Sequence, residues 1–247
     1  LLPQSIYYDS LRELFHTSDG ASFYSHYETN DYLFTFHAGM GTPQISRPSQ
    51  NALLGMTLPG ELIDEEITFS NLLIASQAQD WRIGWTHVEL SSKYVPLFLS
   101  PGTIDINVNM LSAEYTWEKW QLTTEYQHRN FEFRGIQSPS FSLNAPARPY
   151  YVQVSYRFNQ KWQSLIRYDS IYHNKQDKAG KNFSPNSHGF SQDWSLGIRY
   201  EHNQHWLVSA EVHQVNGTAW LSREENKVLD QIQQRWHLFA AQISWRF

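Results

Sequence analysis

The last eleven residues, His237-Leu238-Phe239-Ala240-Ala241-Gln242-Ile243-Ser244-Trp245-Arg246-Phe247, alternate in character. Because side chains of a β-strand point alternately to its two faces, one face of this segment carries His237, Phe239, Ala241, Ile243, Trp245 and Phe247. The opposite face becomes polar toward its end, at Gln242, Ser244 and Arg246. A strand that crosses a membrane needs about 9–11 residues with an apolar outer face, a polar inner face and aromatic ends. This segment therefore predicts a membrane-spanning strand.

The composition of the whole chain agrees with strands that are apolar on one side only. The 247 residues include 10 Trp, 14 Tyr and 14 Phe, yet the mean hydropathy is −0.55. The sequence has no run near the roughly 18–20 apolar residues of a membrane helix, so any crossing must use strands. The net charge of −5 comes without a basic stripe, which argues against nucleic-acid binding. Cysteine is absent, so disulfides and thiolate metal sites are excluded.

A hairpin unit of about 40 residues recurs along the chain. Five short polar turns are each followed by an aromatic residue that opens an alternating run, at Tyr32, Trp81, Trp120, Trp162 and Trp206. Each unit is predicted to contain a strand, a long loop, a returning strand and a tight turn. The returning strands are expected at 21–29, 66–77, 103–117, 149–158, 192–201 and 236–247.

The connections between these strands alternate between short and long. The long ones, expected at 41–65, 91–102, 134–148, 173–191 and 217–235, are rich in Gly, Pro, Ser and Asn. Short turns on one side and long loops on the other are typical of outer-membrane barrels. The predicted fold is all-β, an antiparallel up-and-down transmembrane β-barrel over residues 21–247, with residues 1–20 as a loop before the first strand. Four tryptophans are expected to form an aromatic girdle at the membrane interface, namely Trp81, Trp120, Trp162 and Trp206.

The direction in which each face points follows from the cost of burying charge in lipid. In the run that starts at Trp162, one face carries Ile166 and the other carries Arg167. An Arg or Lys on the lipid face near the middle of the membrane costs about 2–4 kcal/mol, so Arg167 is expected to point inward. Along 103–117 the pattern changes phase between Val108 and Leu111, which we interpret as a β-bulge.

The predicted strand count is odd. Six returning strands and five outgoing strands make eleven, so the first and the last run in the same direction. An open sheet would leave two edges of unpaired amides in lipid, which the bilayer does not tolerate. We therefore expect at least one further strand N-terminal to residue 1.

With the terminal Trp245-Arg246-Phe247 and the hairpin period in view, residues 21–247 resemble the C-terminal part of Gram-negative outer-membrane porin-like barrels. The resemblance is one of pattern and covers most of the chain. It implies a location in the bacterial outer membrane and a terminal strand that serves as the signal for the barrel-assembly machinery. By resemblance, that role would be carried by Phe239, Ile243, Trp245 and Phe247.

Two sets of inward residues are candidates for lining a pore. Arg157, Arg199 and Arg246 each stand near the end of a strand beside an aromatic residue, and if aligned they would form a basic arc at the periplasmic mouth. The alternative is that they merely extend into water at the rim. Farther from the short turns lie inward residues of both signs, which either pair across strands or set ion selectivity. This second set is Glu125, Arg167, Asp169, Glu211 and His213.

Other kinds of site find little support in the sequence. His202 and His205 flank a turn without an evident third metal ligand. No motif of a hydrolase, a phosphate-binding loop or a metalloprotease occurs, so we expect neither enzyme activity, nor a metal, nor a cofactor. The expected partners are outer-membrane lipid, lipopolysaccharide near the basic run 175–181, the barrel-assembly machinery and, as an open option, further copies of the chain.

Three functions remain to be separated. The first is a porin-like channel for passive diffusion of small polar or ionic solutes, constricted by a folded-in loop such as 41–65. The second is a non-conducting structural or adhesion barrel, with paired charges in its lumen and surface loops that bind partners. The third, a soluble β-propeller, has a similar repeat length but needs four strands per repeat, where we find two.

Overall fold

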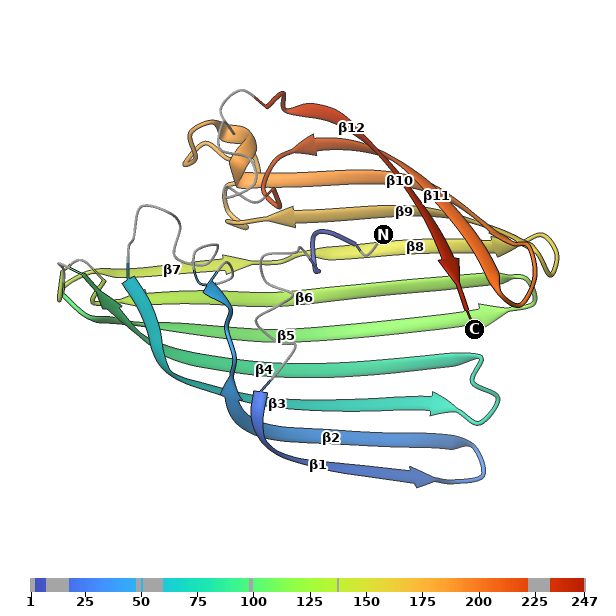
Figure 1. Ribbon diagram of the computed structural model, residues 1–247, viewed down its shortest axis with the longest axis horizontal. Coiled ribbons are helices and arrows are strands. Elements are labelled where there is room, and N and C mark those ends of the chain that lie inside the picture. The colour runs from blue at the N-terminus through green and yellow to red at the C-terminus, as the bar shows by residue number, and fades with distance from the viewer. Residues whose placement is uncertain are drawn as a thin grey trace.

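The computed structural model describes residues 3–7, 18–47, 50, 60–97, 100–136, 138–221 and 232–246. Within these ranges, twelve strands form one antiparallel sheet (Figure 1). They are β1 (Ser18–Glu28), β2 (Tyr32–Pro43), β3 (Gly60–Ser76), β4 (Trp81–Pro96), β5 (Gly102–Trp117), β6 (Trp120–Arg134), β7 (Ser142–Ala147), β8 (Tyr150–Arg157), β9 (Trp162–Tyr172), β10 (Phe190–Glu201), β11 (Trp206–Gly217) and β12 (Arg235–Trp245). In the described ranges, no helix is long and apolar enough to span a membrane.

The strands follow one another in the sheet in chain order, with one exception. Both β7 and β8 pair with β6, at Arg129–Arg134 and at Trp120–Tyr126 respectively. β7 and β8 lie end to end along β6. They are separated at Arg148-Pro149, because proline has no amide hydrogen to donate to the ladder. The hydrogen-bonded path therefore contains eleven strands, which agrees with the predicted number.

The hairpin period is confirmed by the strand boundaries. The outgoing strands β2, β4, β6, β9 and β11 begin at the predicted aromatic residues Tyr32, Trp81, Trp120, Trp162 and Trp206. Short turns lie at one end of the sheet and the longer connections at the other (Figure 1). The first strand begins at Ser18 rather than at residue 21. Its extra residues continue the ladder with β2, where Gly20 pairs with Gly41.

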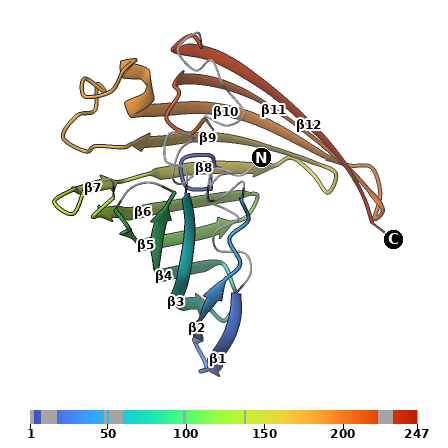
Figure 2. The same cartoon turned by 60° about the vertical axis from the view of Figure 1, so that its left-hand side comes forward.

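The sheet is strongly curved and has two free edges. Figure 2 shows β9–β12 standing at an angle to β1–β4. Among the described strands, β1 pairs only with β2 and β12 pairs only with β11. These two edge strands run in the same direction, as the odd strand count requires.

In the second half of the chain the two faces of the sheet differ sharply. Leu196 and Ile198 are 57% and 48% exposed, whereas Arg167 and Asp169, on the other face, are 2% and 1% exposed. We call the face that carries Arg167 and Asp169 the inner face and the opposite one the outer face. The inward direction predicted for Arg167 is thus confirmed, and the large apolar side chains of β10 point outward.

The predicted bulge between Val108 and Leu111 is wrong. The register of β5 with both β4 and β6 is continuous, and the one irregularity nearby is in β3, between Ile63 and Glu66. The change of phase has another cause, because the two faces of β5 exchange polarity along the strand. Toward the short turns the outer face carries Tyr115 and Leu111, and beyond them it carries Asn109, Asn107 and Asp105.

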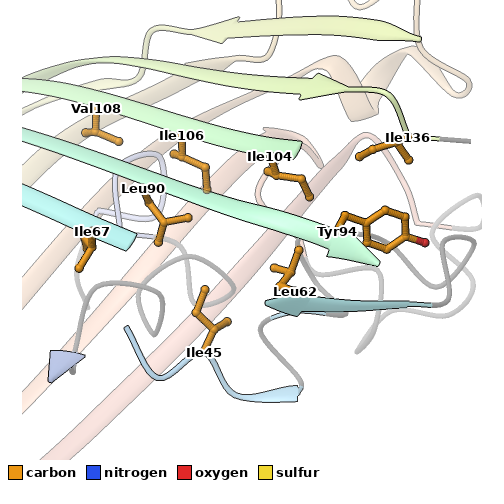
Figure 3. Close-up of a cluster of buried hydrophobic side chains, with 9 residues drawn as sticks. All are labelled: Ile45, Leu62, Ile67, Leu90, Tyr94, Ile104, Ile106, Val108 and Ile136. Carbon is orange, nitrogen blue, oxygen red and sulfur yellow. The ribbon is translucent and has the colours of Figure 1, made fainter. Parts of the chain in front are cut away.

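The inner face of β3–β6 becomes apolar where the outer face becomes polar. Figure 3 shows an apolar cluster made by Ile45, Leu62, Ile67, Leu90, Tyr94, Ile104, Ile106, Val108 and Ile136. Ile45 lies in the connection after β2, and Leu62 is the third residue of β3. Of the predicted folded-in loop 41–65, residues 41–43 belong to β2 and residues 60–65 to β3, and Ile45 packs against the inner face. Residues 48–49 and 51–59 are outside the described residues.

This arrangement indicates where the bilayer ends. The strands β3–β6 are 17, 16, 16 and 15 residues long, longer than the about 9–11 residues that a crossing needs. Their loop-side halves are apolar inside and polar outside, as in a water-soluble sheet. We infer that these halves project beyond the membrane.

Candidate functional site: the charged inner face

An ion pair crosses the inner face of β9–β11. Arg167 on β9 approaches Glu211 on β11, with Nη2 and Oε2 3.1 Å apart, and its Nη1 donates to Gln153 Oε1 at 3.2 Å. The strand between them, β10, presents only small residues there, Ser195 and Gly197. The side chain of Arg167 therefore has room to reach across β10.

A histidine extends this pair. His213 is 1% exposed, and its Nδ1 lies 2.7 Å from Asp193 Oδ2. Its Nε2 lies 3.3 Å from Glu211 Oε2. Nδ1 is hydrogen-bonded to Asp193, whereas Nε2 is within ion-pair distance of Glu211 but makes no hydrogen bond in the described part of the chain. Two carboxylates this close favour the protonated, positively charged ring. The chain Asp193–His213–Glu211–Arg167 thus alternates in charge, which confirms pairing across strands for these residues.

A second group joins the inner face to residues 3–7 near the start of the chain. The backbone N–H of Ser5 donates to Asp169 Oδ2 at 3.2 Å, and the hydroxyl of Tyr7 donates to Glu125 Oε2 at 2.7 Å. Asp169 lies directly opposite Asp193 in the ladder of β9 with β10. Burial and the contact with Glu125 raise the pKa of Tyr7, so its hydroxyl remains a donor.

The position of residues 3–7 was not foreseen. Ser5 and Ile6 are buried against the inner face, and Figure 1 shows this segment beside β8. The sequence analysis treated residues 1–20 as a leading loop, and nothing in Ser5-Ile6-Tyr7 signals a contact with residues more than a hundred positions away. Of the predicted leading loop 1–20, the structure describes only residues 3–7 and 18–20.

The predicted basic arc is formed only in part. Arg157 and Arg199 flank Gln163 on neighbouring strands, and they line a common pocket with Lys161 and Glu201. Arg246 is not in this row, because the ladder continues from Arg199 to Ser209 and then to Gln242. Arg199 also pairs with Glu201, with 2.5 Å between Nη2 and Oε1, which offsets its charge.

The aromatic residues at the short-turn end form a series of ring contacts. Ring centroids are 6.0 Å apart for Tyr32 and Trp81, 4.5 Å for Trp120 and Tyr156, and 4.5 Å for Trp162 and Tyr200. The series ends with Trp206 and Trp245 at 6.4 Å. Aromatic clusters therefore lie at the short-turn end of the sheet, and the predicted place of these tryptophans at the membrane interface stays a prediction.

The terminal strand presents its apolar face outward. Phe239, Ile243 and Trp245 are 77%, 69% and 58% exposed. Phe247 lies outside the described residues. The assembly role expected for these four residues stays a prediction.

Three residues on the inner face have the composition of a hydrolase triad but not its geometry. Asp193 binds His213 as such a triad requires, and Ser195 lies opposite His213 in the ladder. However, Nε2 of His213 faces Glu211, and Ser195 Oγ has no hydrogen-bond partner in the described part of the chain. A nucleophile must be within hydrogen-bond reach of its base, so these residues do not form an activated serine.

Solved structures of outer-membrane proteins are similar to this chain. The chain is similar to OmpT of Vibrio cholerae, described as an outer-membrane protein in its trimer form, with a TM-score of 0.61 and 14% identity over 98% of this chain and 69% of that one. It is also similar to a refined porin structure, with a TM-score of 0.52 and 11% identity over 95% of this chain and 64% of that one. No protein-family model matches the sequence. No curated protein matches it either.

These likenesses agree with the curved antiparallel sheet described above. The chain has the fold of a porin-like outer-membrane β-barrel and spans about two thirds of the length of the solved structures it matches.

Proposed function

We propose that this chain forms the larger part of an outer-membrane channel through which small polar or ionic solutes diffuse passively. The observation that carries the proposal is the contrast between the two faces of β8–β11. The outer face is apolar, with Leu196 and Ile198 exposed, whereas the inner face bears Arg167, Asp169 and Glu211. A lumen lined by fixed charges suits hydrated solutes.

The channel requires further strands to close. Because β1 and β12 run in the same direction, an antiparallel cylinder needs an odd number of additional strands between them. A second copy related by an axis along the membrane normal would bring β1 against β12 in parallel, so it does not meet this requirement. We propose that residues 18–246 form one domain and that the additional strands precede it in the same polypeptide. Mass spectrometry of a closed, native barrel that begins at Leu1 would contradict this.

Two groups of residues occupy parts of the inner face. The apolar cluster that includes Ile45 and Leu62 occupies the loop-side half of the inner face of β3–β6. Residues 3–7 occupy part of the polar half. Among the charged inner-face residues, the side chain of Arg199 is 39% exposed, whereas those of Arg167 and Glu211 are 3% and 11% exposed. We propose that solutes pass beside Arg199 and along the part of the inner face that these two groups leave open.

The alternative function, a non-conducting structural or adhesion barrel, is favoured by the pairing of charges. Arg167, Glu211, His213 and Asp193 form ion pairs with one another and are largely buried. Reconstitution of the full-length protein in planar lipid bilayers separates the two functions. Steady ohmic current supports the channel, whereas an absence of current from folded, inserted protein supports the plugged barrel.

The remaining expectations belong to the same proposal. No catalytic role is assigned, because the inner-face histidine is held between carboxylates rather than beside a nucleophile. Outer-membrane lipid, lipopolysaccharide, the barrel-assembly machinery and further copies of the chain remain the proposed partners.

A further inference from the structure

The sheet has a notch at its long-loop end, where β7 separates from its neighbour. The ladder of β8 with β9 ends at the pair Tyr150 and Ser170. Beyond this pair β7 continues alongside β6 only, while the chain after Tyr172 leaves the sheet. A cavity of about 600 Å³ lies between β7 and the connection that follows β9.

The lining of this cavity is basic and rich in amides. Arg148 and Lys175 supply the positive charges, and Asn144, Gln176 and Asn182 are among the amides that line it. None of the residues that line the cavity is an aspartate or glutamate. Glu132, which lies opposite Asn144 in the ladder of β6 with β7, is within ion-pair distance of Arg134. Within the described part of the chain, no ion pair is recorded for Arg148 or Lys175.

The acidic residue of the connection, Asp177, is held by contacts within the turn. Asp177 accepts hydrogen bonds from the backbone N–H groups of Lys181 and Asn182, at 2.8 and 2.7 Å, so its carboxylate is used to shape the turn. Lys178 lies over the ring of Tyr172, 5.7 Å from its centroid. The connection is thus ordered by its own contacts while Arg148 and Lys175 line the cavity.

The cavity also has an apolar side. Phe183 and Leu143 line it, and the Phe183 ring is 6.0 Å from that of His173. Pockets that bind small ligands combine such apolar surface with a few polar groups that fix orientation. Guanidinium and ammonium groups bind phosphate oxygens strongly, amides bind hydroxyls, and an aromatic ring covers the apolar face of a sugar.

We propose that this notch, lined by Arg148, Lys175, Asn144, Asn182 and Phe183, is a binding site for a phosphorylated saccharide. The phosphate would lie between Arg148 and Lys175, and the sugar ring against Phe183. The same chemistry occurs in a free sugar phosphate and in the phosphorylated head group of a glycolipid.

Calorimetric titration of the full-length protein in detergent tests the site. Glucose 6-phosphate should bind more tightly than glucose, and the double variant Arg148→Gln/Lys175→Gln should lose at least about tenfold in affinity because charge-assisted hydrogen bonds are removed. Asn144→Asp should also weaken binding, since it places a negative charge in the cavity. The matched double variant Arg235→Gln/Lys119→Gln removes one arginine and one lysine from exposed positions outside the cavity and should change the affinity less than about twofold.

Two outcomes would overturn the proposal: equal affinity for glucose and glucose 6-phosphate, or unchanged affinity in the Arg148→Gln/Lys175→Gln variant with its β-sheet circular dichroism intact. Competition identifies the source of the ligand. Displacement of glucose 6-phosphate by lipopolysaccharide supports a glycolipid head group, and its retention supports a free sugar phosphate. The readout is binding rather than current, so this test is independent of whether the barrel conducts.

Discussion

Arg167 and Glu211, 44 positions apart in the chain, form an ion pair across an intervening strand, with 3.1 Å between Nη2 and Oε2. Their side chains are 3% and 11% exposed, so the pair is shielded from bulk water. Glu211 is shared with His213, which is in turn bound by Asp193. The inner face of β9–β11 is therefore a connected network rather than a set of independent charges.

Breaking this pair should be costly. Arg167→Met leaves Glu211 buried without its guanidinium, and the loss of one partner of a buried pair costs about 3–5 kcal/mol. Urea unfolding in detergent micelles measures the free energy of unfolding. The matched control is Arg82→Met. The pair of Arg82 with Glu114 is at the surface and should contribute at most about 1 kcal/mol to the free energy of unfolding. Equal effects of the two substitutions would show that the Arg167 network does not stabilise the sheet.

The absence of a side chain at Gly197 should be necessary for the pair. A Cβ there would lie 2.9 Å from Leu165 Cγ and 3.1 Å from Glu211 Cγ, so Gly197→Ala forces both neighbours to move. Overpacking of this kind costs about 1–3 kcal/mol, which the thermal midpoint of unfolding would report. Ser195→Ala, two residues away on the same face, removes a hydroxyl without a partner in the described residues and should be neutral or stabilising. A neutral Gly197→Ala variant would contradict the proposed crowding.

The exchange of polarity along β5 predicts where arginine is tolerated. Leu111 is 54% exposed on the outer face, within the part assigned to the membrane, and Leu111→Arg should cost about 2–4 kcal/mol. Asn107→Arg is on the same face but in the half that projects beyond the bilayer, beside Glu89, and should cost little. Folding into lipid vesicles, followed by the heat-dependent gel shift of β-barrels, compares the two. A similar penalty at both positions would mean that the bilayer extends past Asn107.

The contact between Tyr7 and Glu125 should restrain residues 3–7. Tyr7→Phe removes a 2.7 Å hydrogen bond to a carboxylate, and such bonds contribute about 1.5–3 kcal/mol. If the proposed channel conducts, the variant should show larger or noisier single-channel currents than the parent. Because the pKa of Tyr7 is raised, mainly by burial, raising the pH of the bath to the ordinary tyrosine pKa should not reproduce the effect. Tyr24→Phe, at an exposed tyrosine of the edge strand β1, is the control and should leave the current unchanged.

The terminal strand can be tested separately for folding and for assembly. Trp245→Ser removes a ring that contacts Trp206 on the outer face. If this residue is part of an assembly signal, the variant should accumulate unassembled in cells while still refolding in detergent. Equal loss in both settings would indicate a purely structural role for the Trp245 ring.

The parts of the fold that depend on neighbouring residues could be predicted from the sequence alone. The starts of β2, β4, β6, β9 and β11 follow from a polar turn and the aromatic residue after it, and the facing of Arg167 follows from alternation and the cost of a charge in lipid. The number of strands on the path, eleven, and the shared direction of the first and last strands follow from the same local signals.

Which inner-face groups contact one another could be seen only in the folded chain. The ion pair of Arg167 with Glu211 spans a strand whose small residues became relevant only once β9–β11 were in register. The contacts of Ser5 with Asp169 and of Tyr7 with Glu125 join residues more than a hundred positions apart. The change of phase between Val108 and Leu111 suggests a bulge because alternation reports polarity, whereas the environment of each face depends on what packs over it. Here Ile45 packs against the apolar inner face of β3–β6. The outer face of the same half is polar, from which we inferred that it lies beyond the bilayer.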